Sequence, residues 1–180
     1  EVNNMELSLK PLSDFSVLTD FRCGVQIMDD FIHHNLQSYV QQCACSPYYL
    51  YDENGSTVAF FVIRFDGLVL VKEDIRNKLD TQCGLKLPDT YPVDVYPSIE
   101  IEYLAVAEHF RLQGIGTECI EQIAALVDEI CNRTDIQFIS VSAYHSAEYS
   151  AIGFYEKCNF FPLEEVNESK DSIRMYRTRQ

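Results

Sequence analysis

Residues 111–116, Arg-Leu-Gln-Gly-Ile-Gly, are the feature that most constrains how this chain can fold. An apolar run over residues 101–106 precedes this motif, and an amphipathic run over residues 117–131 follows it. That order predicts a strand, a glycine turn and a helix. The glycines permit a tight turn because they carry no Cβ, and the helix then presents unpaired N–H groups and the positive end of its dipole. We therefore expect the motif to bind an anion such as a phosphate.

The composition is that of an ordinary globular domain. The chain has 180 residues, of which 47% are hydrophobic and 23% charged, so we expect a single domain over residues 1–180 with a substantial core. No window approaches the roughly 18 consecutive apolar residues of a membrane span. The first residues also lack the basic-then-apolar pattern of a signal peptide. These observations predict no membrane association and a cytoplasmic location.

The charge balance bears on the partner. Aspartate and glutamate number 28 against 14 lysines and arginines, which gives a formal net charge of −14. Nucleic-acid binding depends on lysines and arginines that neutralise phosphates, so this balance disfavours tRNA. An acidic surface favours a cationic amine or a basic peptide instead.

The cysteines and histidines do not form a metal-binding pattern. The seven cysteines are odd in number and scattered, and none lies in a CxxC pair, which predicts free thiols in a reducing compartment. Cys119 and Cys158 are expected to be packing residues rather than nucleophiles. His33 and His34 share a predicted helix but have no second set of ligands. We therefore expect no metal site.

Hydrophobic periodicity predicts an α/β fold, in which an antiparallel set of strands gains a helical crossover near its centre. The Asn54-Gly55 pair signals a hairpin, and the almost continuously apolar strand that follows it is expected to be central and buried on both faces. The predicted strands cover residues 6–11, 48–52, 57–65, 99–106, 136–143 and 172–178. The predicted helices cover residues 28–43, 116–131 and 146–158, and residues 66–98 are expected to be irregular apart from a helix at 72–79.

Two segments together resemble a known family. Leu-Ala-Val at residues 104–106, followed after four residues by Arg-x-x-Gly-x-Gly, is similar to the acetyl-CoA motif of the GNAT acyltransferases. Phe-Tyr-Glu-Lys-Cys-Asn-Phe at residues 154–160 is similar to a later helix end of that family. The resemblance implies the GNAT fold, a central mixed and mostly antiparallel sheet that is splayed at its middle strands and flanked by helices. It also implies acetyl-CoA as co-substrate.

An earlier segment resembles a narrower subgroup. Phe-Arg-Cys-Gly at residues 21–24 and Met-Asp-x-Phe-Ile at residues 28–32 are similar to a bacterial subgroup that includes toxins acetylating aminoacyl-tRNA. Those toxins usually carry an arginine just before Leu-Ala-Val, where this chain has Tyr103. They also tend to be basic. Both differences weigh against tRNA as the acceptor.

The resemblance assigns the cofactor to two stretches of backbone. The N–H groups of residues 113–117 would cradle the pyrophosphate of acetyl-CoA, the strand edge at residues 104–106 would pair with its pantetheine arm, and Arg111 would lie near a CoA phosphate. The implied cofactor-binding residues are Leu104, Ala105, Val106, Arg111, Leu112, Gln113, Gly114, Ile115, Gly116 and Thr117.

The resemblance also implies catalytic roles. The Leu104 N–H would polarise the thioester carbonyl, as in an oxyanion hole, and Tyr155 would donate a proton to the departing CoA thiolate. The attacking amine must be neutral, so it requires a base or a water path. Glu100 matches the position of a catalytic glutamate in the histone-modifying branch. Glu102 lies two residues further and on the same strand face, so the two like charges together would suit a base.

Four positions depart from the family pattern or add to it. Asn159 replaces the usual glycine before the last phenylalanine, which affects a turn more than the chemistry. Glu148 stands where many members have an asparagine that contacts the cofactor. His109 and His145 follow predicted strands near the site, where either would serve as a proton relay.

The sequence thus predicts an N-acetyltransferase that transfers an acetyl group to a primary amine by direct attack in a ternary complex. The acceptor is a small molecule or a protein, and its pocket is expected from residues 66–98 and the first helical region. One alternative is a toxin-type enzyme that acetylates aminoacyl-tRNA, with basic residues such as Arg22, Lys72, Arg76, Lys78 and Lys86 along an acceptor channel. A second alternative is a catalytically silent acyl-CoA-binding module. Both a monomer and a homodimer are consistent with the sequence.

Overall fold

The computed structural model describes residues 6–43, 45–69, 81, 95–131, 133–134, 136–146, 149–164 and 170–179. The predicted helix at residues 72–79 lies outside the described residues. So do Glu148 and four of the basic residues predicted along an acceptor channel, namely Lys72, Arg76, Lys78 and Lys86. The strands are β1 (Ser8–Pro11), β2 (Ser46–Tyr51), β3 (Thr57–Val69), β4 (Val95–Val106), β5 (Phe138–Tyr144), β6 (Phe161–Pro162) and β7 (Ser172–Thr178). The helices are η1 (Phe15–Leu18), α1 (Gln26–His34), α2 (Leu36–Gln42), η2 (Glu108–Phe110), α4 (Ile115–Cys131) and α5 (Ile152–Lys157).

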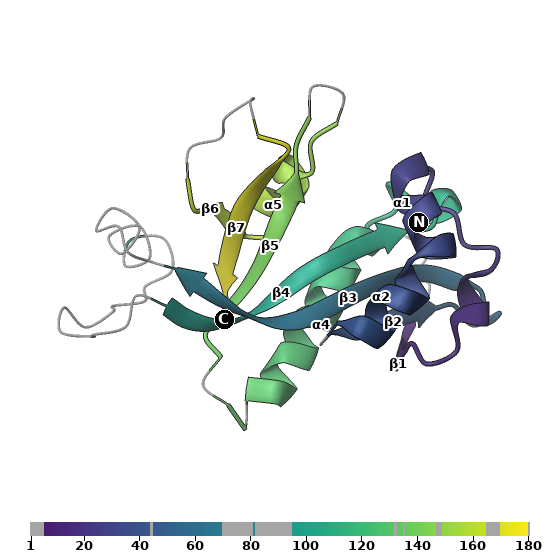
Figure 1. The fold of residues 1–180 in the computed structure, drawn as a ribbon, viewed down its shortest axis with the longest axis horizontal. Helices are drawn as coiled ribbons and strands as arrows, with labels where there is room; N and C mark the ends of the chain where they lie inside the picture. The colour runs from purple at the N-terminus through teal and green to yellow at the C-terminus, as the bar shows by residue number, and fades with distance from the viewer. Residues whose placement is uncertain are drawn as a thin grey trace. The chain divides into compact units, whose positions relative to one another are not determined.

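The described strands form one sheet of seven, in the order β1-β2-β3-β4-β5-β7-β6. Strand β2 pairs antiparallel with β1 and β3, and β7 pairs antiparallel with β5 and β6. Helix α4 joins β4 to β5, and this is the helical crossover that the sequence predicts (Figure 1). The mostly antiparallel sheet with flanking helices confirms the predicted fold class.

The chain divides into two compact units. Unit 1 comprises Glu1–Arg64 and Ile101–Ala125, and unit 2 comprises Phe65–Glu100 and Leu126–Gln180. Strands β3 and β4 and helix α4 contribute residues to both units. Each unit is described separately below.

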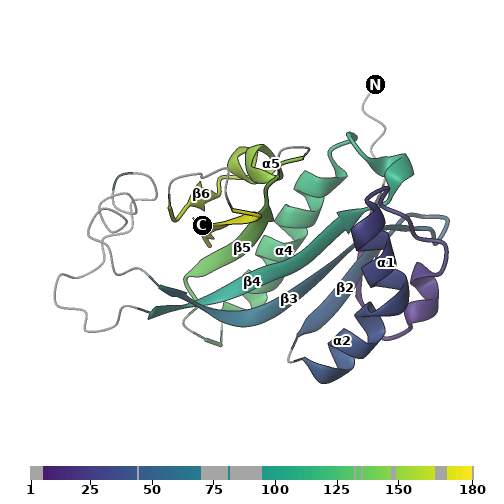
Figure 2. The same cartoon turned by 45° about the horizontal axis from the view of Figure 1, so that its top comes forward.

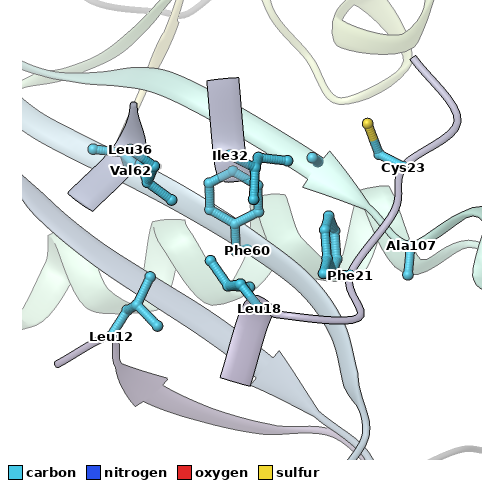
Figure 3. Close-up of a cluster of buried hydrophobic side chains, with 10 residues drawn as sticks. Leu12, Leu18, Phe21, Cys23, Ile32, Leu36, Phe60, Val62 and Ala107 are labelled. Carbon is cyan, nitrogen blue, oxygen red and sulfur yellow. The ribbon is translucent and has the colours of Figure 1, made fainter. Parts of the chain in front are cut away.

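In unit 1, helices α1 and α2 lie over one face of β2, β3 and β4, and the first part of α4 lies on the opposite face (Figures 1 and 2). The ring of Phe60 on β3 meets Phe21 edge-on at 5.6 Å between ring centroids, below Ile32 of α1 (Figure 3). Leu36, at the start of α2, is fully buried in the same cluster. This apolar cluster therefore holds the α1–α2 region against the sheet.

The apolar first half of β3 is central, as predicted. Its residues Val58 to Val62 are all 0% exposed, so both faces of the strand are covered. The predicted hairpin at Asn54-Gly55 is also present, with Gly55 at φ +80°. The Asp52 carboxylate shapes this hairpin loop by accepting hydrogen bonds from the N–H groups of Asn54 and Ser56.

In unit 2, strand β5 pairs with β7 along their full lengths, from Phe138 opposite Thr178 to Tyr144 opposite Ser172. Phe138 and Tyr176 pack edge-on with their ring centroids 6.1 Å apart, and Tyr96 meets Phe138 in the same way at 5.9 Å. Strand β7 occupies the residues that the sequence predicts for it. Among the helices that the structure describes, none combines the length and the apolarity that a membrane crossing requires.

Two predicted helices were wrong in extent. The single helix expected over residues 28–43 is broken at Asn35, whose φ of −123° lies outside the helical region, and asparagine is a weak helix former because its side chain competes for backbone hydrogen bonds. The helix expected over residues 146–158 begins only at Ile152. Before it, Ser146 and Tyr149 close a turn through backbone and side-chain hydrogen bonds, and His145 bridges to Ser150.

The region expected to be irregular was also too wide. Strand β3 continues to Val69 and β4 begins at Val95, so both strands extend into the predicted loop. The sequence prediction ended β3 at the polar and glycine residues Asp66 and Gly67, yet the backbone pairing continues through them. The short strand β6 was missed because two residues carry no periodic signal.

Candidate active site

In unit 1, the glycine turn follows β4 directly, as predicted. The Ala107 N–H donates to Val58 O at 2.8 Å, and the chain then passes through η2 into α4. Leu112 and Gly114 both adopt left-handed backbone conformations, at φ +60° and +84°. Such a conformation is unusual for leucine, and non-glycine residues in it concentrate at functional turns.

Helix α4 opens from this turn. Glu118 N–H donates to Gly114 O at 3.0 Å, which is the first backbone bond of the helix. The N–H groups of residues 114–117 precede that bond and lie at the positive end of a 17-residue helix. Gly116 lies in the first helical turn rather than at a positive φ, so its expected role in turning the chain falls to Gly114. This geometry is suited to an anion.

The side chains of the turn bond to nearby backbone. Arg111 is exposed, and its Nη1 donates to Cys23 O at 3.3 Å. Gln113 Nε2 donates to His109 O at 2.8 Å. Leu112 projects fully into solvent. The Arg111 bond links the glycine turn to the Phe-Arg-Cys-Gly segment, a connection that the sequence analysis did not foresee.

A buried carboxylate fixes that segment in turn. Asp29 accepts hydrogen bonds from Cys23 N–H at 2.7 Å and from Gly24 N–H at 3.2 Å. Gly24 has φ +79°, which strains other residues, and a Cβ there would lie 3.1 Å from the Glu108 carboxyl carbon, so the position favours glycine. Glu108 N–H also donates to Arg22 O at 2.8 Å. We call Asp29, Cys23, Gly24 and Glu108 the Asp29 clamp.

The ionisation of these groups follows from their surroundings. Burial acts to raise the pKa of Asp29, but hydrogen bonds from Cys23 and Gly24 and the charge of Arg22 outweigh it and lower the pKa. Burial raises the pKa of the Cys23 thiol to about 11 and that of Cys119 to about 12. Neither thiol is poised as a nucleophile, in agreement with the packing role expected for Cys119.

The predicted strand edge at residues 104–106 lies in the same unit. Ala105 is buried, whereas Leu104 and Val106 are half-buried. Glu102, two residues before Leu104, accepts a short hydrogen bond from the Tyr39 hydroxyl and forms an ion pair with Arg64, with 3.6 Å between Nη1 and Oε1. The other carboxylate oxygen, Oε2, is buried and has no hydrogen-bond partner among the described residues.

Three aromatic rings of unit 1 pack against one another, and one of them, that of Tyr39, carries the hydroxyl that donates to Glu102. Phe31 of α1 stacks on Tyr103 of β4 at 4.4 Å between centroids, and Tyr39 of α2 meets both rings edge-on, at 5.8 and 5.7 Å. Burial, followed by the neighbouring charge of Glu102, raises the pKa of Tyr103 and of Tyr39. The Tyr39 hydroxyl therefore stays protonated and acts as a donor to Glu102. We call Glu102, Tyr39, Phe31 and Tyr103 the Glu102 cluster.

In unit 2, Tyr155 lies in α5 and is 7% exposed. Its ring packs edge-on against Phe154 and Phe160, with centroids 5.0 and 5.4 Å away. The helix ends in a Schellman motif, since Phe160 N–H donates to Tyr155 O and Asn159 N–H donates to Glu156 O. Asn159 takes φ +63°, so asparagine makes the turn for which the family uses glycine.

Glu100 also belongs to unit 2, where it is 5% exposed. Arg174 of β7 donates to Glu100 Oε1 and to Asp66 Oδ2 in short ion pairs, and its guanidinium also reaches Ser140 and Ser142 at 3.0 and 3.1 Å. We call this the Arg174 network. Its members are drawn from β3, β4, β5 and β7, and it holds one of the two oxygens of the predicted base.

Glu100 and Glu102 therefore have separate partners. The sequence analysis treated them as a pair of like charges on one strand face, whereas the structure gives each carboxylate its own arginine. Sequence reasoning missed Arg174, Asp66 and Tyr39. The available signal was the position of Arg174 between the buried Ile173 and Met175 of β7.

The remaining candidates have local roles. His145 Nδ1 lies 3.0 Å from Ser150 Oγ, and the His109 carbonyl accepts from Gln113. Arg22 Nη1 donates to Thr19 O and Phe21 O and also lies 2.5 Å from His33 Nε2. No group of three or more potential metal ligands occurs in the part of the chain that the structure describes.

Comparison with known proteins places these features in a family. The sequence profile of the acetyltransferase (GNAT) domain matches residues 45–162, which include β4, the glycine turn and Tyr155. A search of curated protein sequences finds no match.

Solved structures share the fold at low sequence identity. A crystal structure of a bacterial toxin has a TM-score of 0.73 and 16% identity, covering 97% of this chain and 91% of that one. AtaT complexed with acetyl-methionyl-tRNAfMet has a TM-score of 0.70 and 17% identity, covering 94% of both chains. AtaTR bound with AcCoA has a TM-score of 0.69 and 18% identity, covering 97% of this chain and 94% of that one.

Proposed function

The chain belongs to the acetyltransferase (GNAT) family, and we propose that it transfers an acetyl group from acetyl-CoA to a primary amine by direct attack in a ternary complex. The observation that carries the proposal is the turn between β4 and α4. Its left-handed residues Leu112 and Gly114 aim the first N–H groups of α4 out of the helix end, in a family whose co-substrate bears a pyrophosphate.

Acetyl-CoA binding would use mainly backbone. The N–H groups of residues 113–117 bind the pyrophosphate, and the edge at residues 104–106 pairs with the pantetheine arm. Arg111, which bonds to Cys23 O, supports the shape of the turn and adds positive charge beside the phosphates. A solved structure of the same fold, AtaTR bound with AcCoA, supports this choice of co-substrate.

The chemistry follows from those contacts. The neutral amine attacks the thioester carbonyl carbon, and the Leu104 N–H stabilises the negative charge that develops on the carbonyl oxygen. The C–S bond then breaks as the carbonyl reforms, and Tyr155 donates its phenolic proton to the CoA thiolate. The amine loses one proton, which restores the tyrosine through solvent. The burial of Tyr155 among aromatic rings supports its role, because it fixes the direction of the hydroxyl.

Removal of the proton from the amine needs an acceptor. Glu100 is the base that the family resemblance suggests, but one of its oxygens already accepts from Arg174 and Ser142. Glu102 is the alternative, and its Oε2 has no partner among the described residues. We keep both carboxylates as candidate proton acceptors, and the pH profile of kcat in Glu100→Gln and in Glu102→Gln would separate them.

A second candidate function is acetylation of the amino group of aminoacyl-tRNA. The likeness to AtaT, which was solved with acetyl-methionyl-tRNAfMet, favours it. The net charge of −14 and the tyrosine at position 103 oppose it. A catalytically silent acyl-CoA-binding module is the remaining alternative.

A parallel turnover assay tests these proposals. CoA release from acetyl-CoA is measured with small primary amines, lysine-containing peptides and charged tRNA as acceptors, with the Tyr155→Phe variant as control. Acetylation of amines or peptides, slowed in the variant, supports the main proposal. Turnover with charged tRNA alone supports the second candidate. Acetyl-CoA binding without turnover on any acceptor would establish the silent module.

A further inference from the structure

We propose that Asp29 is a positioning residue for acetyl-CoA binding, and that it acts through residues 21–24 on the glycine turn. This inference rests on the proposed acetyltransferase function and names a part of the chain on which its co-substrate site depends. The two segments that resemble the narrower bacterial subgroup, residues 21–24 and 28–32, thereby gain a role in the site. All the residues concerned lie in unit 1.

Asp29 joins these two segments to each other. Its Oδ1 accepts from the Cys23 N–H at 2.7 Å, and its Oδ2 accepts from the Gly24 N–H at 3.2 Å. The residue is 9% exposed, and each of its carboxylate oxygens has a backbone donor. A carboxylate would in any case repel a phosphate. An effect of Asp29 on acetyl-CoA must therefore pass through the backbone that it fixes.

Two hydrogen bonds connect residues 21–24 to the chain just before the glycine turn. The Glu108 N–H donates to Arg22 O at 2.8 Å, and Arg111 Nη1 donates to Cys23 O at 3.3 Å. Glu108 and Arg111 are themselves joined, because the Arg111 N–H donates to Glu108 O at 3.3 Å. Both connections thus reach η2 and the residue that follows it, which lead directly into the glycine turn.

The glycine turn needs such support from outside. Leu112 takes φ +60°, and a strained conformation of this kind persists only when the surrounding structure over-determines it. The Leu112 side chain is fully exposed, so its own packing does not hold the backbone in place. The bond from Arg111 to Cys23 O, in the residue next to it, is part of what does. An anion site made of backbone N–H groups depends on this fixed geometry, since hydrogen bonds weaken steeply when their donors are misaligned.

Net charge gives the proposal a distinctive sign. Asp29→Asn removes a negative charge from the unit that binds an anionic ligand, so electrostatics alone would tighten binding. Positioning predicts the opposite, a weaker affinity. We expect Asp29→Asn to raise the Kd for CoA, measured by isothermal titration calorimetry, about 2- to 30-fold. Asp30→Asn makes the same charge change at an exposed residue outside the Asp29 clamp and should leave that Kd unchanged or slightly lower.

A core variant separates positioning from a general loss of stability. Leu36→Ala truncates a fully buried side chain of the same unit that is not part of the Asp29 clamp. It should lower the midpoint of thermal unfolding at least as far as Asp29→Asn, yet leave the Kd for CoA unchanged at a temperature where both variants are folded. In turnover, Asp29→Asn should raise the KM for acetyl-CoA while kcat and the KM for the acceptor stay the same.

Gly24→Ala provides a second variant that keeps both the net charge and the Asp29 carboxylate. Its added Cβ would lie 3.1 Å from Glu108 Cδ and 3.2 Å from Glu108 Oε1, so it presses on the residue that leads into η2. We expect Gly24→Ala to raise the Kd for CoA as Asp29→Asn does. This variant decides the question if Asp29→Asn does not fold.

The outcomes separate the two levels of proposal. If Asp29→Asn binds CoA as tightly as Asp30→Asn, or if Leu36→Ala weakens binding as much as Asp29→Asn does, the positioning role is overturned and the acetyltransferase function stands. The same holds if Asp29→Asn does not fold and Gly24→Ala binds CoA like the wild type. If the wild-type protein binds neither CoA nor acetyl-CoA, the proposed function itself fails.

Discussion

The Asp29 clamp yields the sharpest stability prediction. Asp29 Oδ1 accepts from Cys23 N–H at 2.7 Å and Oδ2 accepts from Gly24 N–H at 3.2 Å. In Asp29→Asn, the amide oxygen keeps one of these bonds, and the amide NH2 faces the other donor. Loss of one hydrogen bond to a charged group costs about 2 kcal/mol. For a chain of this size, that loss corresponds to a fall of about 4–8 °C in the midpoint of thermal unfolding.

The effect should depend on pH in a defined direction. The folded protein lowers the pKa of Asp29 below its usual value of 3.8, so between these two values the folded state binds fewer protons than the unfolded state. The contribution of the carboxylate is therefore fully present above pH 3.8 and is lost as the pH falls through the folded pKa. The difference between wild type and Asp29→Asn should be constant near neutral pH and shrink in acid.

The neighbouring residue supplies the control. Asp30→Asn changes the net charge equally, but Asp30 is exposed and accepts only from Gln26 Nε2 at 2.8 Å in the described contacts. Thermal unfolding followed by circular dichroism at several pH values should show Asp30→Asn within about 0.5 kcal/mol of wild type. Equal midpoints for the two variants at neutral pH would refute the clamp. A raised KM for acetyl-CoA in Asp29→Asn alone would link the clamp to the glycine turn.

Three further variants address the proposed catalytic parts. A Cβ added at Gly114 would meet no heavy atom within 4 Å, so Gly114→Ala should cost only the strain of its φ of +84°, about 1–2 kcal/mol of stability. We also expect this variant to raise the KM for acetyl-CoA, and an unchanged KM would contradict the role of the turn. Tyr155→Phe keeps the ring contacts, so kcat should fall about 100-fold with a nearly unchanged melting midpoint, and an unchanged kcat would exclude the tyrosine as acid. Glu100→Gln breaks a buried pair with Arg174 and should lower the free energy of unfolding by about 3 kcal/mol. If the variant, measured at a temperature where it is folded, also has a lower kcat and an altered pH profile, Glu100 is the base as well as a structural partner.

The sequence predicted those parts of the fold in which local pattern and burial agree. Strand β7 and the buried half of β3 were placed correctly because their apolar residues have no alternative to a sheet core. The helix over residues 28–43 failed because its apolar spacing continues through Asn35, although the backbone does not. Hydrophobic periodicity shows which side chains face the core. A helix break after which the same side chains still face the core does not change that periodicity, so the pattern cannot reveal it.

In the candidate site, too, local features could be predicted from the sequence and long-range partners could not. The glycine turn could be predicted because the anion site of a helix end is a property of contiguous backbone. The partners of the two glutamates could not, because Arg174 lies 74 positions from Glu100 and Tyr39 lies 63 positions from Glu102. The spacing of Glu100 and Glu102 along β4 predicts a shared strand face but says nothing of partners so distant in the sequence. The structure has one carboxylate in the Arg174 network and the other in the Glu102 cluster.

The different partners of Glu100 and Glu102 predict different roles for the two carboxylates of β4. Glu100 and Glu102 are the two carboxylates of β4 that the proposed function keeps as candidate proton acceptors, and each has its own arginine. Glu100 is 5% exposed and pairs with Arg174, and removal of one partner from a buried pair is strongly destabilising. Glu102 is less buried, and its ion pair with the more exposed Arg64 is longer, at 3.6 Å. The partner set of each carboxylate, rather than its place in a family motif, therefore decides our expectation that thermal stability will respond more to Glu100 than to Glu102.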